Sequence, residues 1–493
     1  MATVGMSREQ RLVLWIAILA SFVAFLDGTV VTVALPSIMR ELGGGLATQQ
    51  WVVDAYLITL GALILVAGSL SDLYGRMRVI RLGLIGFGLT SIAIAAAPSP
   101  EFLIVARALQ GVAGALLVPS SLALITSTFR DEAQARAIGT WTALTTAAMV
   151  AGPVIGGLFV DLASWRYAFL INVLPIGVTL WLLARLVRVG RRDERHPGAR
   201  IDWLGAVLCT VGLGSAVFAL IEQPNLGWSP LIVITLTVGV LAFAGFLVRQ
   251  RFAAQPMMPL SLFRVRNFWS GNITTLFVYA ALSLNGFVLG VYLQQGAGLP
   301  ATLAGLATLP ATLIMIALSS RVGAWSGRIG PRFFMTVGPL LMAAGALLLL
   351  TVSTDFSYWW QVLPSVLVFG FGLTLTVSPL TAAILGAIEP ARSGIASAVN
   401  NAVARVAGLL VIAVLAAIVG GQLDLAGFHR AAIVTAVLLA AGGIVSWIWI
   451  RKPEDQPGSA AALGAADAEG TSTAEGTGTA AETDAAEEAT DGR

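Results

Sequence analysis

Charged and chemically reactive side chains are scarce in this chain of 493 residues. Charged residues make up 11% of it, and it has one cysteine and two histidines. One cysteine cannot form an intramolecular disulfide, and His196 and His429 have no second ligand nearby that would complete a metal site. The GxxxxGK[ST], GxSxG and HExxH patterns of nucleotide hydrolases, serine hydrolases and metalloproteases are absent. We therefore expect no enzyme activity, no metal, no cofactor and no use of ATP.

Long apolar segments dominate the sequence instead. Hydrophobic residues make up 57% of the chain and the mean hydropathy is +0.86, values beyond the range of soluble domains. Fourteen apolar runs of about 20 residues follow one another between residues 12 and 450, and each is long enough to cross a bilayer as an α-helix. The ten-residue alternation of membrane β-barrel strands is absent. These features predict an all-α membrane protein with fourteen transmembrane helices.

The distribution of positive charge sets the expected orientation. Of the 29 Lys and Arg residues, only Arg40, Arg166 and Arg430 lie in the connections on one side of the predicted spans. Basic residues in short connections are retained on the cytoplasmic side. We therefore expect both termini in the cytoplasm and a multi-pass protein of the cytoplasmic (inner) membrane.

Two related segments divide the membrane part into halves. GSLSDLYGRMRVIRLG (68–83) and GAWSGRIGPRFFMTVG (323–338) carry glycines and a serine at equivalent positions. Six spans, a related six, and two additional spans between them is the simplest arrangement, and parallel repeats of this kind are typical of transporters. After 452 the composition turns acidic and low in apolar residues, which predicts disorder. The expected units are an N-terminal six-helix half (1–187), a basic linker (188–200), two additional helices (201–250), a C-terminal six-helix half (251–452) and a disordered acidic tail (453–493).

Five short motifs give the sequence its resemblance to a known family. They are LDGTVVTVALP (26–36), QWVVDAYLI (50–58), GSLSDLYGRMRV (68–79), RALQG (107–111) and AGPVIGG (151–157). Together they resemble the motifs of spans 1, 2, 4 and 5 and of the loop between spans 2 and 3 in the major facilitator superfamily. Within it the chain is most similar to the drug:proton antiporters with fourteen spans, the group that contains quaternary-ammonium exporters. The resemblance covers residues 12–450 and implies a fold of two six-helix repeats with two additional central helices.

The resemblance also implies a function. It indicates a secondary active transporter that exports amphiphilic, cationic drugs or toxic compounds in exchange for protons, with the proton gradient as its energy source. The implied partners are a small amphiphilic substrate, protons and the lipid bilayer, with no nucleic acid, and the implied state is a monomer. Two alternatives stay open: a dedicated exporter of a metabolite, lipid or antibiotic made by the host cell, and a receptor or scaffold that has kept a transporter fold.

Three charged residues within the spans are the candidates for proton coupling. Asp27 lies about 22 Å from the cytoplasmic end of span 1, while Asp54 and Arg107 lie about 7 Å from the outer ends of spans 2 and 4. All three are thus expected at one level of the outer half. Charges within the membrane are costly and usually functional. We expect Asp27 to carry the proton, Arg107 to modulate it and Asp54 to be a second site; a static ion pair between spans 1 and 4 is the alternative.

The loop after span 2 is a candidate conformational latch. Gly68 and Gly75 allow close approach of helix ends, and Asp72 can pair with an arginine or with the N-terminus of a neighbouring helix. We expect Gly68, Asp72, Gly75 and Arg76 to hold the cytoplasmic ends of the halves together in the outward-facing state. Arg76 and its neighbouring arginines also serve the orientation of the chain.

The antiporter motif of span 5 is a candidate working surface. Gly152, Pro153, Gly156 and Gly157 leave the helix smooth, and the proline removes one backbone hydrogen bond. Ordinary close helix packing is the alternative. The family resemblance implies that this helix controls leakage and antiport.

The remaining candidates line the expected substrate cavity. Arg405 lies near the middle of span 13 and is the central charge of the C-terminal half, where it either counters a carboxylate or contacts substrate. Asn400 and Asn401 precede it by one to two turns and serve either the cavity or hydrogen bonds between helices. The full predicted cavity set is Asp27, Asp54, Tyr56, Asn400, Asn401 and Arg405.

Overall fold

The structure is a computed structural model that describes residues 6–190, 201–253, 256–389 and 392–451. Within these ranges every element is helical and no strand occurs. Fourteen helical segments are long and apolar enough to span a membrane, which confirms the predicted number. The predicted acidic tail and most of the predicted linker lie outside the described residues.

The helices follow the order expected from the sequence. The N-terminal half contains α1 (Arg8–Leu42), α2 (Leu46–Tyr74), α3 (Arg76–Ala95), α4 (Pro100–Ala115), α5 (Leu117–Thr128), α6 (Asp131–Leu162), α7 (Trp165–Leu170) and α8 (Val173–Arg188). Two additional helices follow, α9 (Trp203–Leu226) and α10 (Pro230–Phe252). The C-terminal half contains η1 (Leu260–Arg264), α11 (Arg266–Gln295), α12 (Ala301–Ala307), α13 (Leu309–Ile329), α14 (Pro331–Leu348), η2 (Leu349–Thr351), η3 (Tyr358–Val362), α15 (Leu363–Leu385), α16 (Ser393–Ala413), α17 (Leu415–Val419) and α18 (Leu425–Trp449).

Several spans are built from two consecutive helices with a break between them. The span Pro100–Thr128 combines α4 and α5, Trp165–Arg188 combines α7 and α8, and Ala301–Ile329 combines α12 and α13. A break frees backbone groups and redirects side chains inside the bundle. The break between α7 and α8 falls at Ile171 and Asn172, and Asn172 is wholly buried there.

The two related segments found in the sequence form turns of the same geometry. Gly75 joins α2 to α3 with φ 99°, and Gly330 joins α13 to α14 with φ 100°. Each glycine donates its N–H to a buried serine carbonyl one turn earlier, that of Ser71 or Ser326. A positive φ of this size favours glycine, so the glycine that both segments carry at this position follows from backbone conformation.

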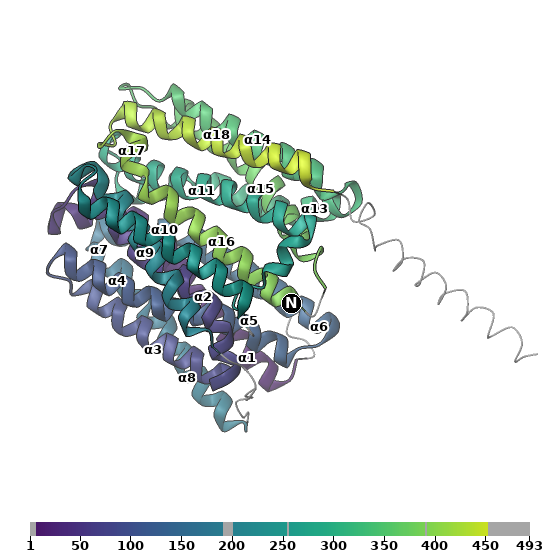
Figure 1. The fold of residues 1–493 in the computed structure, drawn as a ribbon. Coiled ribbons are helices and arrows are strands. Elements are labelled where there is room, and N and C mark those ends of the chain that lie inside the picture. Colours follow the sequence, from purple (N-terminus) through teal and green to yellow (C-terminus); the bar gives the residue numbers. More distant parts are fainter. Residues whose placement is uncertain (1–5, 191–200, 254–255, 390–391, 452–493) are drawn as a thin grey trace, which may run out of the picture.

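The two ends of the bundle differ in how the halves meet. We call the end of the bundle with the Gly75 and Gly330 turns and residue 451 the basic face, and the other end the opposite face. The C-terminal end of α18 marks the basic face on the right of Figure 1. At the opposite face one apolar cluster combines side chains of α1, α2, α11, α12, α16 and α18. Towards the basic face one cluster is formed by helices α1–α6 and α8 and another by α13–α15, while a further cluster joins α2 and α9 to α11, α15 and α16. The halves are therefore joined across the opposite face and, along one side, by the seam of α2 with α16.

Four glycines towards the basic face have open space beside them. A Cβ added at Gly68, Gly139, Gly327 or Gly394 would meet nothing within 4 Å. Among the described residues, hydrogen bonds join the halves at the other end: Gln50 donates to the Ile412 carbonyl and Gln294 to the Val33 carbonyl. Over the described residues the bundle is thus closed at the opposite face and, away from the seam of α2 with α16, open at the basic face.

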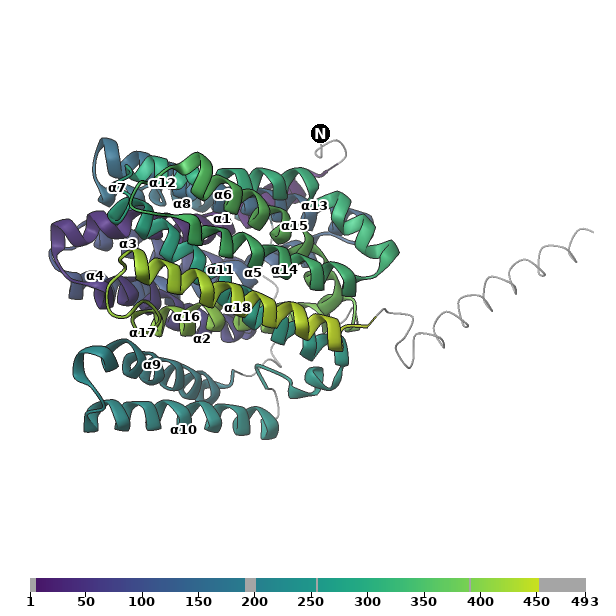
Figure 2. The ribbon, with the colours of Figure 1, turned by 90° about the horizontal axis from the view of Figure 1, so that it is seen from above.

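Helices α9 and α10 form a hairpin along one side of the bundle, with α10 outermost (Figure 2). α9 packs on α2 of one half and also contacts α16 of the other. Polar contacts fix both ends of the hairpin: Trp51 on α2 donates to Glu222 at 2.7 Å, and the buried Asp202 accepts from Arg249 and Gln250. The additional helices therefore cover the seam between α2 and α16.

Candidate functional site

Asp27 on α1 is the centre of a buried polar network. Arg107 on α4 donates to Asp27 Oδ2 at 2.5 Å, and both side chains are buried. The other carboxylate oxygen, Oδ1, accepts from Gln110 at 3.1 Å and from Asn172 at 3.0 Å. Ser91 on α3 accepts from Gln110 at 3.0 Å. Asp27 and Arg107, which the sequence places at one level of the outer half, are in contact in the structure although they are 80 residues apart along the chain.

Local structure explains how these side chains reach Asp27. Gln110 follows Arg107 by three residues on α4, so both lie on one face of that helix. The Arg107 side chain also donates to the Val52 carbonyl of α2 and to Gln110 Oε1. Its guanidinium lies 4.3 Å from the centre of the Tyr56 ring, a favourable cation–π distance. Tyr56, one of the predicted cavity residues, thus packs its ring against the Arg107 guanidinium.

The network is neutral overall and its carboxylate is fully supplied with donors. An ion pair in a low-dielectric interior is tolerated when hydrogen bonds satisfy both partners, as they do here. Loss of the Arg107 contact would leave Asp27 as an unpaired buried charge, which favours uptake of a proton. The arrangement is therefore able to link proton binding to any movement that separates α1 from α4. A static brace between these two helices has the same geometry.

Asp54 is not part of this network. It is wholly buried on α2, and neither of its carboxylate oxygens has a hydrogen-bond partner in the described part of the chain. A buried carboxylate without donors has no local group that would stabilise a negative charge. Its predicted role as a second proton site stays a prediction.

The predicted cavity residues of α16 differ in their surroundings. Asn400 donates to Asn272 at 3.2 Å and to Thr275 at 2.8 Å, both on α11, so it forms hydrogen bonds between helices. Asn401 donates to the Ser397 carbonyl of its own helix. Arg405 is half-buried, and its guanidinium lies 5.9 Å from the Phe25 ring of the other half. Contact of these three residues with substrate stays a prediction.

The predicted latch residues lie in the hairpin formed by α2 and α3. Asp72 pairs with Arg76 at 3.4 Å, one turn further along the same hairpin, and its side chain is 45% exposed. A Cβ added at Gly68 would meet nothing within 4 Å, so the close approach expected at this glycine does not occur here. Gly75 has the positive φ described above. The latch remains a prediction for a conformation closed at the basic face.

Replacing Asp72 by asparagine is expected to slow transport at least about threefold while leaving the amount of folded protein unchanged. The exposed pair with Arg76 contributes little to stability, about 0.5 kcal/mol, so the variant should fold normally. In the conformation closed at the basic face, the variant would lack the carboxylate contact that the latch prediction assigns to Asp72, so this conformation would form less readily. Transport in proteoliposomes and thermal unfolding of the purified variant measure the two effects. Normal turnover would reduce this loop to an orientation signal.

The glycines of the span-5 motif lie in two close helix contacts, one with α1 and one with α12. On one side α6 packs against α1, where a Cβ on Gly152 would lie 2.0 Å from Thr29 Oγ1 and one on Gly156 would lie 3.3 Å from Val30 Cγ2. On the other side α6 meets α12 of the other half. A Cβ on Gly157 would lie 2.6 Å from the Ala301 carbonyl oxygen, and one on Gly305 would lie 2.3 Å from that of Pro153. The motif is therefore a close contact between the halves at the opposite face.

Asp161, near the end of the same helix, is exposed and also joins the halves. Its carboxylate accepts the backbone N–H groups of Ala301 and Thr302, at 3.0 and 2.7 Å, and the Thr302 hydroxyl at 2.6 Å. These are the first residues of α12, whose free N–H groups a carboxylate satisfies well. Asp161 therefore caps a helix of the C-terminal half from the N-terminal half.

Replacing Asp161 by alanine should shift the conformational equilibrium towards opening of the opposite face. Loss of a capping carboxylate costs about 1 kcal/mol, which corresponds to about a fivefold change in the ratio of the two conformations. Spin labels at the exposed Leu174 and Leu303, one on each half, would report the change as a longer distance. Asp355→Ala, an exposed acid whose carboxylate makes no contact to a described residue, is the matched control. Equal distance distributions for both variants would contradict the capping role.

Gln110, Asn172 and Ser91 are site residues that the sequence analysis missed. Gln110 was detectable, because it lies in the RALQG motif one turn after Arg107. Asn172 gave no such signal, since its position depends on the break between α7 and α8. In the described residues no three His, Cys, Asp or Glu side chains are grouped so that they could hold a metal ion.

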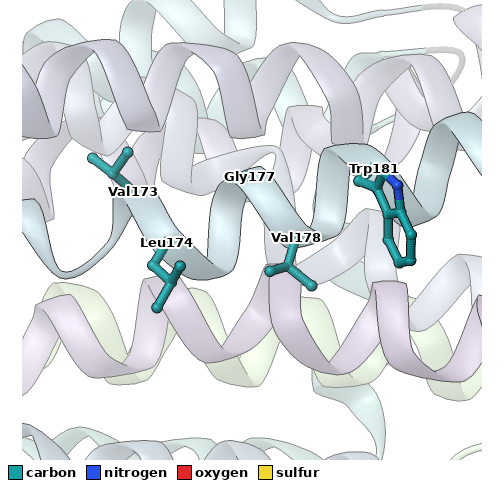
Figure 3. Close-up of a pocket in the computed structure, with 5 residues that line it drawn as sticks. All are labelled: Val173, Leu174, Gly177, Val178 and Trp181. Carbon is teal, nitrogen blue, oxygen red and sulfur yellow. The ribbon is translucent and has the colours of Figure 1, made fainter.

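A shallow apolar depression of about 470 Å³ lies outside this network, on the exposed face of α8. Its lining comes from one helix: Val173, Leu174, Gly177, Val178 and Trp181 (Figure 3). Leu174 is 75% exposed, and the lining contains no charged group. A surface of this kind suits contact with lipid chains, so we do not assign substrate to it.

A fourteen-helix bundle of two halves, joined at one face and carrying a buried charge network, defines the class of membrane transporters that work by alternating access. The chain belongs to the Major Facilitator Superfamily, whose family profile matches residues 17–412.

The chain is similar in sequence to several resistance and export proteins. The chain is 36% identical to the methylenomycin A resistance protein of Bacillus subtilis over 413 residues, 83% of this chain and 87% of that protein. It is 33% identical to the cephamycin export protein CmcT of Amycolatopsis lactamdurans over 409 residues, 82% and 84% of the two chains. It is 34% identical to the multidrug resistance protein Stp of Mycobacterium tuberculosis over 421 residues, 85% and 78% of the two chains.

The fold has solved counterparts. A crystal structure of the peptide transporter POT in complex with sulfate superposes with a TM-score of 0.65, covers 91% of this chain and 97% of its own, and is 16% identical in sequence. At that identity the likeness concerns the fold alone.

Proposed function

We propose that this protein exports amphiphilic drugs or toxic compounds across the cytoplasmic membrane in exchange for protons. The observation that carries the proposal is the buried network of Asp27, Arg107, Gln110 and Asn172, a titratable group held where movement of helices would change its partners. The names of the relatives, resistance and export proteins, support drug export. The proposal includes a monomer that uses the proton gradient and no cofactor.

Orientation follows from the same charge distribution that the sequence analysis used. With the basic face in the cytoplasm, the structure is the conformation that is open to the cytoplasm and ready to load substrate. Closure at the opposite face by α6 and α12 then keeps the exterior sealed. A change to the outward-open conformation must break the Asp161 and Gly157 contacts and bring the Asp72 loop against the C-terminal half.

A dedicated exporter of a compound made by the host cell is the second candidate. It is favoured by the relative named as the cephamycin export protein and by one from Streptomyces coelicolor named as a probable actinorhodin transporter, 31% identical over 415 residues. Both candidates use the same fold and the same coupling network. They differ in the range of compounds accepted.

The cationic substrate that the resemblance implies would need a carboxylate in the cavity, and Asp27 and Asp54 are the two acidic residues of the predicted cavity set. Both are wholly buried here, and Asp27 has a complete set of donors, so neither offers a charge to a substrate in this conformation. A lipophilic cation would have to displace Arg107 from Asp27 to be recognised by it.

A transport panel in proteoliposomes tests the proposal. Matched cationic, neutral and anionic amphiphiles are offered to vesicles with an imposed pH difference, and we expect accumulation of at least one class against its concentration gradient. Dissipation of the pH difference with nigericin should abolish this accumulation. Substrate movement that nigericin leaves unchanged would contradict proton coupling, and a lack of flux for every compound would favour the receptor or scaffold alternative.

A further inference from the structure

Arg405 is the central charge that the rest of the site leaves unpaired. It lies on α16 about 18 Å from the beginning of that helix at the basic face. Its guanidinium forms no ion pair and no hydrogen bond with any residue in the described ranges, and it lies 5.9 Å from the centre of the Phe25 ring. An arginine in the membrane interior is costly and is normally paired or functional.

The carboxylates of the site do not neutralise Arg405. Asp27 is committed to Arg107, Gln110 and Asn172 through both of its oxygens. Asp54 is wholly buried and has no donor of any kind in the described part of the chain. The charge of Arg107 is balanced by Asp27, so the positive charge of Arg405 is left over.

The surroundings of Arg405 are amphipathic and come from both halves. Phe25 of α1 provides an aromatic face, and Gly61 of α2 leaves room, since a Cβ there would lie 3.6 Å from the Arg405 Cβ. Tyr56 and Tyr279 lie within electrostatic range of its guanidinium, and neither hydroxyl donates to a described residue. Arg405 and Tyr279 are half-buried, in contrast to the buried Asp27. The Arg405 guanidinium, the half-buried Tyr279 and the Phe25 ring are thus placed together at the interface of the halves, while Tyr56 is buried beneath Arg107.

We propose that Arg405 binds the carboxylate of an amphiphilic substrate whose apolar part packs against Phe25 and Tyr279. A guanidinium holds a carboxylate through two parallel hydrogen bonds, and it is the side chain best suited to planar anions. The inference rests on the proposed transport function and names its substrate class as amphiphilic carboxylates. Outward movement of an anion from a cytoplasm at negative potential is favoured by the membrane potential, whereas that of a cation is opposed.

Binding of three matched probes to the full-length protein tests this site without any need for transport. The probes are 4-hexylbenzoate, 4-hexylbenzamide and 4-hexylbenzyltrimethylammonium, which share the apolar part and differ in charge. Calorimetric titrations use protein in phosphatidylcholine nanodiscs, with empty discs as the blank for partition into lipid. We expect the wild type to bind 4-hexylbenzoate more tightly than the other two probes.

Three variants define the role of Arg405. Arg405→Gln should weaken 4-hexylbenzoate binding about 10- to 100-fold, the range of a charge-assisted hydrogen bond, and leave 4-hexylbenzamide binding within about threefold. Arg405→Lys keeps the charge but loses the planar fork, so its loss should be smaller. Arg40→Gln removes an exposed arginine that hydrogen-bonds Ser37 at the opposite face, and it should change nothing. Saturating 4-hexylbenzoate should also raise the unfolding temperature of the wild type and not that of Arg405→Gln.

Several results would overturn the assignment. One is equal affinity of the wild type for the benzoate and the trimethylammonium probe, and another is 4-hexylbenzoate binding that Arg405→Gln leaves unchanged. A wild type without saturable 4-hexylbenzoate binding up to the solubility limit would do the same. If phosphatidylglycerol in the discs displaces 4-hexylbenzoate from the wild type, the anion site belongs to a lipid headgroup instead. Failure of proton coupling in the transport panel would refute the proposed function and leave these binding results standing.

Discussion

Replacing Asp27 by asparagine is expected to abolish accumulation of substrate against its gradient, a loss of about 100-fold or more in coupled transport. Asparagine resembles the protonated carboxylic acid in shape and cannot exchange a proton. The variant should still bind substrate, because Asp27 is buried and committed to its own network. Uphill uptake into proteoliposomes under an imposed pH difference measures the loss.

The unpaired Arg107 of that variant requires a control of its own. Removing one partner of a buried ion pair costs about 3–5 kcal/mol, because the other charge stays buried without compensation. The double variant Asp27→Asn, Arg107→Gln is neutral again and should be more stable than the single variant. If Asp27 carries the proton, the double variant stays uncoupled. If the pair is only a brace between α1 and α4, it regains uphill transport, and Asp54 becomes the next candidate.

Replacing Gly157 by leucine is the second change for which we expect a large effect. A Cβ at this position lies 2.6–2.7 Å from backbone atoms of Ala301 and Thr302, which a rotamer change cannot move away. Overpacking of a close contact costs about 1–3 kcal/mol, which corresponds to about a 5- to 150-fold shift in the equilibrium between conformations. The opposite face should no longer close, and transport should fall at least tenfold.

Accessibility at the basic face distinguishes this outcome from simple misfolding. A carrier held open at the opposite face should close at the basic face, so a cysteine introduced at Gly68 should react more slowly with a polar thiol reagent than in the wild type. Gly139→Leu is the control on α6, the helix that also carries Gly157, because a Cβ at Gly139 meets nothing within 4 Å. Normal transport by Gly157→Leu would show that the span-5 glycines serve ordinary packing.

The sequence determined the features of this protein that depend on local properties. The fourteen spans follow from the length of apolar runs, because a helix must satisfy its own backbone within the bilayer and therefore needs about 20 apolar residues. The equivalent turns at Gly75 and Gly330 follow from a positive φ that glycine adopts without strain. The pairing of Asp27 with Arg107 was within reach of the sequence, because the rise per residue placed both at one level.

The tertiary structure alone decided which of these groups meet and which face is closed. Asp54 was expected at the level of Asp27, yet depth along a helix does not fix rotation about its axis, and Asp54 lies outside the network. Asn172 reaches Asp27 because of a break between α7 and α8, and the contacts of Gly157 and Asp161 with α12 join segments about 140 residues apart. Contacts between distant segments depend on how the helices pack against one another, which hydropathy and motif spacing do not specify.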